Sequence, residues 1–203
     1  MTDENNGTDN KVIFLGEAGV GKTSLMKIST GGTFDEEYNS SISLSFSPRT
    51  VEYNNNKYIF NLWDTIGQEK YRSLTKIFFK KSKIVIFVYD ITDKASFDNL
   101  EYWINAVSNE LSSENYIKAI VGNKSDLFLN EKIKEDEAEK YATSKHCKFK
   151  LCSAKNDPLN FVKFLDQLCI ELIKKNEANE ERKKETVTLN KKEIKKDKKN
   201  CSC

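Results

Sequence analysis

The sequence predicts an α/β fold: a six-stranded, mostly parallel sheet with one antiparallel edge strand and helices on both faces. Short apolar runs alternate with helical patterns through most of the chain, and strands that alternate with helices form parallel sheets. The exception is a short Asn-rich segment between the second and third apolar runs, which is typical of a hairpin turn. Sheets of this kind bind ligands at the carboxyl ends of their strands.

Each strand candidate is a run of apolar or β-branched residues. The six are Lys11–Leu15, Phe46–Tyr53, Lys57–Trp63, Ile84–Tyr89, Ile117–Gly122 and Lys148–Cys152. The turn "YNNNKY" pairs the second strand with the third as an antiparallel hairpin. Pro48 lies in the second strand and lacks an N–H group, so this strand is expected at the sheet edge.

The helix candidates show apolar residues spaced three and four apart. They are Lys22–Ser29, Gln68–Lys80, Ala95–Leu111, Lys134–Lys145 and Leu159–Lys174. His146 follows the fourth helix, and no partner constellation surrounds it in the sequence, so we interpret it as a surface or capping residue. Cys147, Cys152 and Cys169 lie in apolar or mixed segments and are interpreted as reduced core thiols.

Composition favours one globular domain with a basic tail. The chain has 203 residues, 38% hydrophobic and 32% charged, with a net charge of +2. Its longest apolar run, "IVIFVY", is too short for a membrane span. Residues 174–203 hold 11 Lys and Arg against 6 Asp and Glu. We expect a flexible N-terminus at 1–10 without a signal peptide, a domain at 11–174, and a flexible, disordered tail at 175–203.

The stretch "GEAGVGKTS" fits the pattern G-x-x-x-x-G-K-S/T and follows the first strand. Its residues are Gly16, Glu17, Ala18, Gly19, Val20, Gly21, Lys22, Thr23 and Ser24. Glycines let backbone N–H groups surround a phosphate, and the next helix offers its N-terminus to the anion. We expect Lys22 on the outer phosphates and the Thr23 hydroxyl on Mg²⁺. A plain Gly-rich turn is the weaker alternative, so the α/β sheet is predicted to be a P-loop NTPase fold.

The segment "VGNKSD" places Asn123, Lys124 and Asp126 at the carboxyl end of the fifth strand. A fixed carboxylate accepts hydrogen bonds from both N1–H and the 2-amino group of guanine. Adenine offers neither donor, so a buried charge would stay unpaired. In "CSAK", Ser153, Ala154 and Lys155 end the last strand and are expected to complete this guanine pocket.

The segment "WDTIGQE" follows the third strand. Asp64 is expected to hold Mg²⁺ through water, and the Gly67 N–H to reach a terminal phosphate. Gln68 is the candidate catalytic residue, because an amide there orients the attacking water.

These motifs, in this order, resemble the Ras-superfamily small GTPases. "WDTIGQEKYRSL", "YDIT" and the terminal "CSC" are similar to the Rab family. The resemblance implies a switch that cycles between GDP and GTP, needs Mg²⁺, and regulates vesicle traffic. By position, Phe34 stacks on guanine and Ser41 binds Mg²⁺ and the γ-phosphate. Phe46, Trp63 and Tyr71 form an aromatic effector surface, with core or sheet-face packing as the alternative.

Three positions depart from the family pattern. Ser41 replaces a threonine, Ser43 a glycine and Ile66 an alanine beside Gln68. Nucleotide binding is still expected, whereas intrinsic hydrolysis is expected to be slow without a GTPase-activating protein. A membrane-anchored, GTP-binding scaffold with very slow hydrolysis is therefore the alternative. Ala18 is small enough to leave room for the glutamine.

The resemblance also implies partners: an exchange factor, a GTPase-activating protein, effectors, an escort protein and a prenyl-binding chaperone. Geranylgeranyl groups on Cys201 and Cys203 would hold a monomer at the cytoplasmic face of an intracellular membrane, with a cytosolic pool. We expect no nucleic-acid partner, because the basic tail lacks aromatic residues and mixes its charges. A P-loop phosphotransferase is disfavoured, because the chain has only three arginines and they do not cluster.

Overall fold

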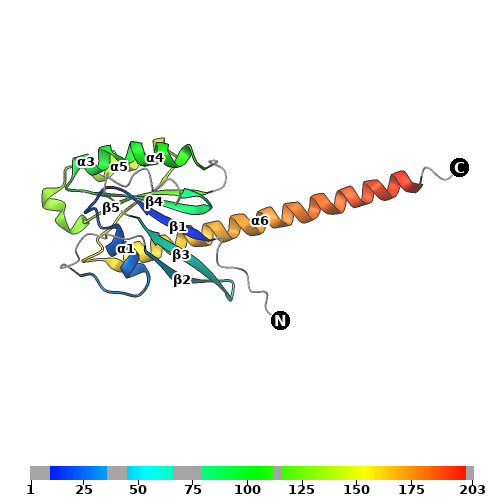
Figure 1. Cartoon of the computed structure of the whole chain (residues 1–203), viewed down its shortest axis with the longest axis horizontal. Coiled ribbons are helices and arrows are strands. Elements are labelled where there is room, and N and C mark those ends of the chain that lie inside the picture. Colours follow the sequence, from blue (N-terminus) through cyan, green and yellow to red (C-terminus); the bar gives the residue numbers. More distant parts are fainter. Residues whose placement is uncertain (1–9, 36–44, 66–78, 112–115, 200–203) are drawn as a thin grey trace.

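The computed structural model describes residues 10–35, 45–65, 79–111 and 116–199, without the side chains of Ser45 and residues 183–199. In this part of the chain, one sheet has the strand order β2-β3-β1-β4-β5-β6 (Figure 1). The strands are β1 (Lys11–Leu15), β2 (Ser45–Tyr53), β3 (Asn56–Asp64), β4 (Ser82–Asp90), β5 (Ile117–Asn123) and β6 (Lys148–Leu151). Each lies within two residues of its predicted bounds.

The pairing pattern confirms the predicted fold class. Strand β2 pairs with β3 antiparallel, and every other pair in the sheet is parallel. At the hairpin, Asn54 and Asn55 have φ values of 50° and 61°. Positive φ at both central residues is the signature of the tight turn that matches the strand twist. Pro48 lies in the edge strand, as its missing N–H predicts.

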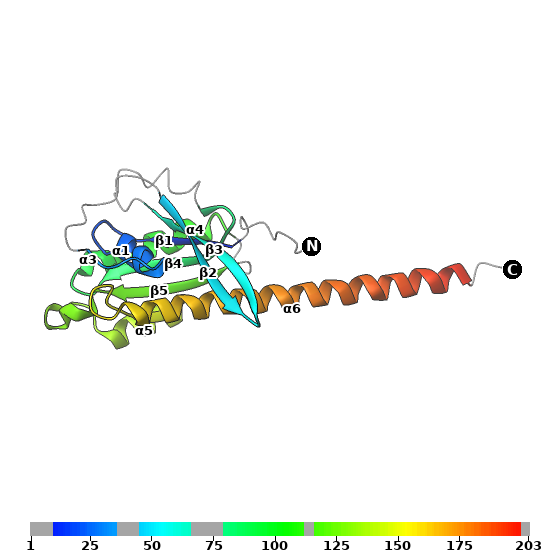
Figure 2. The same cartoon turned by 90° about the horizontal axis from the view of Figure 1, so that it is seen from below.

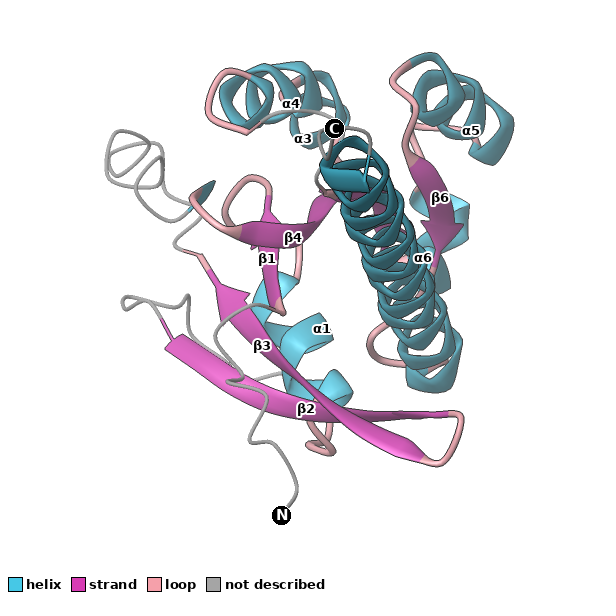
Figure 3. Ribbon diagram, turned by 90° about the vertical axis from the view of Figure 1, so that its right-hand side faces the viewer, coloured by secondary structure: helices cyan, strands magenta, loops and turns pink. Residues whose placement is uncertain are grey.

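Helices cover both faces of the sheet. They are α1 (Lys22–Ser29), α3 (Lys94–Asp98), α4 (Leu100–Ser108), α5 (Glu135–Ser144) and α6 (Pro158–Lys199), with a 3₁₀ helix η3 at Ser125–Asn130. Figure 3 shows α1 and α6 on one side of the sheet and α3, α4 and α5 on the other. The helix predicted at Gln68–Lys80 lies almost entirely outside the described residues.

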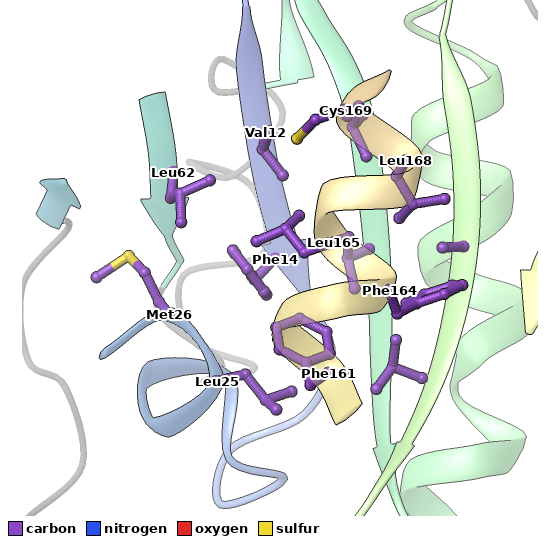
Figure 4. Close-up of a cluster of buried hydrophobic side chains, with 14 of the residues drawn as sticks. Val12, Phe14, Leu25, Met26, Leu62, Phe161, Phe164, Leu165, Leu168 and Cys169 are labelled. Atoms are coloured by element: carbon purple, nitrogen blue, oxygen red, sulfur yellow. The ribbon is translucent and has the colours of Figure 1, made fainter. Parts of the chain in front are cut away.

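Among the described residues, the core consists of two clusters, one on each side of the sheet. On the α6 side, Phe14 of β1 packs against Phe161 of α6 with ring centroids 6.1 Å apart. Leu25 of α1 and Leu165 of α6 lie in the same cluster (Figure 4). Burying each such side chain contributes roughly 2 kcal/mol. This packing fixes α1, and with it the end of the glycine-rich loop, against the sheet.

An arginine connects the hairpin to both helices of that face. The Arg49 guanidinium donates to both carboxylate oxygens of Asp166 in α6, at 2.7 and 2.8 Å. It also donates to the carbonyl oxygen of Ser29 at the end of α1. Paired, fork-shaped contacts of this kind are stronger than single hydrogen bonds.

Two helix predictions were wrong. The segment 95–111 forms two helices, α3 and α4, because Asn99 has ψ −7° and interrupts the regular helix. The last helix does not end at Lys174 but continues to Lys199 (Figure 2). Residues 175–199, which were expected to be disordered, are therefore helical. No Gly or Pro interrupts the chain between 159 and 199, and Lys, Glu and Arg are good helix formers.

The expectations for the cysteines and the histidine in this part of the chain are confirmed. Cys147, Cys152 and Cys169 are free thiols, half-buried in the first case and buried in the other two. Burial raises the pKa of Cys152 to about 12, so this thiol stays protonated. His146 is exposed just beyond α5, with φ 55°.

Candidate nucleotide-binding site

The predicted motifs meet at the carboxyl ends of the parallel strands. The glycine-rich loop follows β1, Asp64 ends β3, Asn123 ends β5, and "CSAK" follows β6. Because these strands run in one direction, their carboxyl ends lie at one edge of the sheet. The site is therefore assembled from four loops that are far apart in the sequence.

The phosphate loop needs its glycines for two physical reasons. Gly16, Gly19 and Gly21 have φ values of 148°, 79° and 95°, which side chains rarely adopt. A Cβ atom on Gly16 would lie 2.1 Å from the Val88 carbonyl oxygen, and one on Gly21 would lie 2.2 Å from Asn123 Nδ2. Beside Gly19, by contrast, no atom would lie within 4 Å of an added Cβ. The loop is thus tightly packed underneath and open at its tip.

Lys22 is buried beneath this loop. Its ammonium donates to the carbonyl oxygens of Gly16 at 3.1 Å and Glu17 at 2.8 Å. Burial lowers the pKa of Lys22 to about 8, against the opposing attraction of Asp64 and Glu17. A buried cation with a lowered pKa is ready to bind a group that supplies negative charge, as the phosphates of a nucleotide do.

We predict that nucleotide binding takes up a proton near Lys22 above pH 8. The unfolded pKa of 10.5 exceeds the folded value, so the unfolded state binds more protons between pH 8 and 10.5. The stability of the nucleotide-free protein should therefore rise with pH through this window. Phosphates favour charged Lys22, so GDP affinity should instead fall as pH rises above 8, by up to about tenfold per unit.

Calorimetry of GDP binding at pH 8.5, in two buffers of different ionisation enthalpy, measures the protons taken up. The control is Lys22→Met, in which that uptake should disappear. Equal uptake by the parent and Lys22→Met would contradict the assignment to Lys22.

Thr23, at the start of α1, and Asp64, at the end of β3, bring two side-chain oxygens together. The Thr23 hydroxyl donates to Asp64 Oδ2 at 2.5 Å, and Asp64 is almost fully buried. Hydroxyl and carboxylate oxygens are the ligands that Mg²⁺ prefers, together with phosphates and waters. These residues fit the predicted magnesium ion. Within the described residues, no cluster of three or more His, Cys, Asp or Glu could hold a metal ion.

Asn123 connects three of the four loops. Its amide Nδ2 donates to the Val20 carbonyl oxygen in the phosphate loop at 2.9 Å. Its Oδ1 accepts the Ala154 N–H at 3.2 Å, and the side chain is buried. The base-reading segment, the phosphate loop and the end of β6 are thereby held in one arrangement.

Asp126, the predicted guanine reader, is positioned by Ser153. The Ser153 hydroxyl donates to Asp126 Oδ1 at 2.5 Å and accepts the Asn156 N–H at 2.9 Å. The hydrogen bond to Oδ1 fixes the orientation of the whole carboxylate. The Asp126 side chain is only half-buried, so it remains accessible to a ligand. Lys155, also predicted in this pocket, is exposed.

Two residues near the site were not predicted. Asp90, at the end of β4, pairs with Lys124 at 2.6 Å and accepts from the Thr92 N–H at 2.8 Å. Lys124 has φ 65°, so this ion pair holds an unusual backbone conformation. The place of Asp90 directly beside Asn123 in the sheet register is the signal that identifies it. Trp103 of α4 donates its indole N–H to Glu17, and no motif marks it.

The structure describes three of the four aromatic residues predicted by position: Phe34, Phe46 and Trp63. Phe34 is half-buried and packs against the core cluster on the α6 side. Phe46 is 59% exposed and stacks on Trp63, with ring centroids 5.2 Å apart. Lys11 lies over the Trp63 ring at 4.6 Å. An aromatic pair is therefore present on the β2–β3 surface.

Several predicted residues lie outside the described part of the chain. They are Ser41, Ser43, Ile66, Gly67, Gln68, Tyr71, Cys201 and Cys203.

Comparison with known proteins gives the family. The model of the Ras family matches residues 11–174. Ras-related protein Rab-18 of Lymnaea stagnalis is 37% identical over 147 residues, which cover 72% of this chain and 72% of that protein. Ras-related protein Rab-22A of Homo sapiens is 39% identical over 146 residues, covering 72% of this chain and 75% of that protein. GTP-binding protein YPTM2 of Zea mays is 36% identical over 146 residues, with 72% and 71% covered.

The matched residues contain the whole sheet and each loop of the site just described. The chain therefore belongs to the Ras family and is a Rab-family small GTPase.

Proposed function

We propose that this chain is a molecular switch of vesicle traffic that binds GTP and GDP with Mg²⁺ and hydrolyses GTP to GDP and phosphate. The observation that supports the proposal is the junction at Asn123, whose side chain binds both the Val20 carbonyl oxygen of the phosphate loop and the Ala154 N–H. Ala154 follows Ser153, whose hydroxyl donates to Asp126, the proposed base reader. A relative of this chain, from Zea mays, is named a GTP-binding protein. The proposal extends this binding to a regulated hydrolysis cycle.

In this proposal each residue of the candidate site has one task. Lys22 neutralises the outer phosphates, and the phosphate-loop N–H groups surround them. Thr23 and Asp64 hold the magnesium ion, which neutralises charge on the phosphates. Asp126 accepts hydrogen bonds from guanine. Lys124 borders the base, and the ion pair with Asp90 holds Lys124 in place. Gln68 orients the attacking water, and Ser41 and Gly67 respond to the γ-phosphate.

Competition binding tests the proposal most directly. A fluorescent GDP analogue is bound to the full chain in Mg²⁺ and displaced with GTP, GDP or ATP. We expect GTP and GDP to compete and ATP to fail, because a site built for hydrogen bonds to guanine rejects a base without them by roughly 10⁴-fold. Equal displacement by ATP and GTP would contradict a guanine-nucleotide switch.

We predict that Gln68→Leu slows single-turnover GTP hydrolysis about tenfold or more, because leucine cannot orient water. Nucleotide affinity should stay within about twofold, since Gln68 is not expected to hold the ground-state nucleotide. The companion variant Ile66→Ala restores the residue that the family pattern has beside Gln68 and should raise the intrinsic rate. An unchanged rate in Gln68→Leu without any partner would contradict a catalytic role for this glutamine.

Ile66 also favours a second candidate function. A bulky β-branched group beside Gln68 would make the chain a GTP-binding scaffold whose output is effector binding alone. Adding a GTPase-activating protein separates the two functions, because an arginine finger accelerates a competent site by 10³- to 10⁵-fold. A switch responds to such a protein, whereas a scaffold does not.

The proposed switch acts on an intracellular membrane with an exchange factor, a GTPase-activating protein and effectors. In the described part of the chain, no helix has the length and apolar character to cross a bilayer. Attachment is proposed to come from geranylgeranyl groups on Cys201 and Cys203, with an escort protein and a prenyl-binding chaperone serving a monomer. Phe46 and Trp63, with Tyr71, are the proposed effector surface.

A further inference from the structure

The phosphate loop contains a carboxylate, which is an unfavourable group to place beside phosphates. Glu17 is the second residue of the loop, and its carbonyl oxygen accepts the Lys22 ammonium at 2.8 Å. Its side chain is also close enough for its charge to act on Lys22. A Glu17 carboxylate turned toward the loop would repel bound phosphates and compete with them for Lys22.

The described contact turns this carboxylate the other way. Trp103 Nε1 donates to Glu17 Oε1 at 3.1 Å. Trp103 is 1% exposed and lies on α4, on the opposite face of the sheet from α1. The Glu17 side chain is therefore held toward α4.

The donor is rigid because α4 is fixed by its apolar face. Leu100, Ile104 and Val107 are buried with Trp103 in one core cluster. The ring of Tyr102 also meets the indole nearly edge-on, at 5.3 Å between centroids. The indole N–H therefore keeps a fixed direction, and Glu17 must come to it.

The loop is thus fastened from two sides. Asn123 holds the Val20 carbonyl oxygen at 2.9 Å, and Trp103 holds the Glu17 side chain. Between these points lie Ala18 and Gly19, both exposed. The two contacts leave the tip of the loop open while they fix its flanks.

We propose that Trp103 is a positioning residue for nucleotide binding: its indole N–H holds the Glu17 carboxylate away from the phosphates. The proposal rests on the guanine-nucleotide function proposed above. A tryptophan of the core would thereby control how close the negative charge of Glu17 comes to the bound phosphates. Without the indole N–H, the released carboxylate weakens nucleotide retention through repulsion.

Release of a fluorescent GDP analogue from the full chain in Mg²⁺ tests this proposal in four proteins. They are the parent, Trp103→Phe, Glu17→Gln and the double variant. Phenylalanine keeps an aromatic ring in the core but removes the donor, and glutamine keeps an acceptor but removes the charge. Ile104→Val is the matched control, because it trims a buried neighbour on α4 without touching the hydrogen bond.

We expect Trp103→Phe to accelerate release about tenfold at low salt, and less at 1 M salt, where exposed charges are screened. In the Glu17→Gln background the same tryptophan change should have little effect, because the repelling charge is gone. Ile104→Val should show no such dependence on residue 17. Thermal unfolding of each variant in GDP checks that the fold is retained.

A role of Trp103 in packing alone makes a different prediction. Trp103→Phe would then accelerate release by the same factor with Glu17 or Gln at position 17, and salt would not reduce it. That result, or no acceleration at all, would overturn the proposal. A parent chain that retains no guanine nucleotide would instead overturn the proposed function, and this inference with it.

Discussion

Asp126→Asn is expected to exchange the base preference of the site from guanine to xanthine. The Asp126 carboxylate is oriented by the Ser153 hydroxyl at 2.5 Å, which leaves lone pairs for N1–H and the 2-amino group of guanine. In Asp126→Asn, the amide N–H of asparagine would face the 2-amino group of guanine, and two donors cannot form a hydrogen bond. Xanthine has a 2-oxo group at this position, which accepts a hydrogen bond from the amide. Two charge-assisted hydrogen bonds are lost, so GTP affinity should fall roughly 10³-fold or more.

The measurement is competition of GTP, xanthosine triphosphate and ATP against a fluorescent nucleotide, for the parent and Asp126→Asn. Ser153→Ala is the matched control, because it removes the group that orients the carboxylate but keeps the charge. It should weaken GTP and GDP binding modestly without creating a xanthine preference. If Asp126→Asn binds GTP as tightly as the parent, this residue does not read the base.

The fold was predictable wherever burial of an element requires a recognisable pattern of apolar residues in the sequence. Strands β1 and β4 are covered on both faces, so they appear as continuous apolar runs that are easy to recognise. The C-terminal part of α6 has no such apolar pattern. A Lys-rich segment with few apolar residues suits both a disordered chain and a long solvated helix. The absence of Gly and Pro after residue 158 was the stronger signal.

The site was predictable where chemistry fixes the residue types at short spacing. Lys22 and Thr23 follow from the phosphate loop, and Asn123 and Asp126 from one short motif at a strand end. Asp90 and Trp103 act through partners that are far away in the sequence, at Lys124 and Glu17. Such contacts depend on how α4 and the sheet dock, and a single sequence carries no record of docking. For Asp90, the nearest signal in the sequence was its place at the end of the apolar run that forms β4.

Removing both terminal cysteines is expected to release the protein from membranes. The proposed lipid sites, Cys201 and Cys203, follow a helix that leads away from the sheet (Figure 1). One lipid chain gives only reversible attachment, whereas two anchor stably. Residues 191–199 add six lysines against two acidic residues, and each basic residue near an anionic leaflet contributes up to about 1 kcal/mol. These lysines should assist the lipids without replacing them.

Fractionation of cells that express the full chain with an N-terminal tag measures this effect. The double variant Cys201→Ser, Cys203→Ser should move almost entirely to the supernatant, and each single variant should divide between the fractions because one chain dissociates readily. Ser202→Ala is the matched control, since it changes the residue between the cysteines and leaves both thiols; it should pellet like the parent. A double variant that still pellets to the parental extent would show that another part of the chain provides the anchor. In that case the basic residues of 191–199 would be the next to test, because added salt releases an electrostatic anchor but not a lipid one.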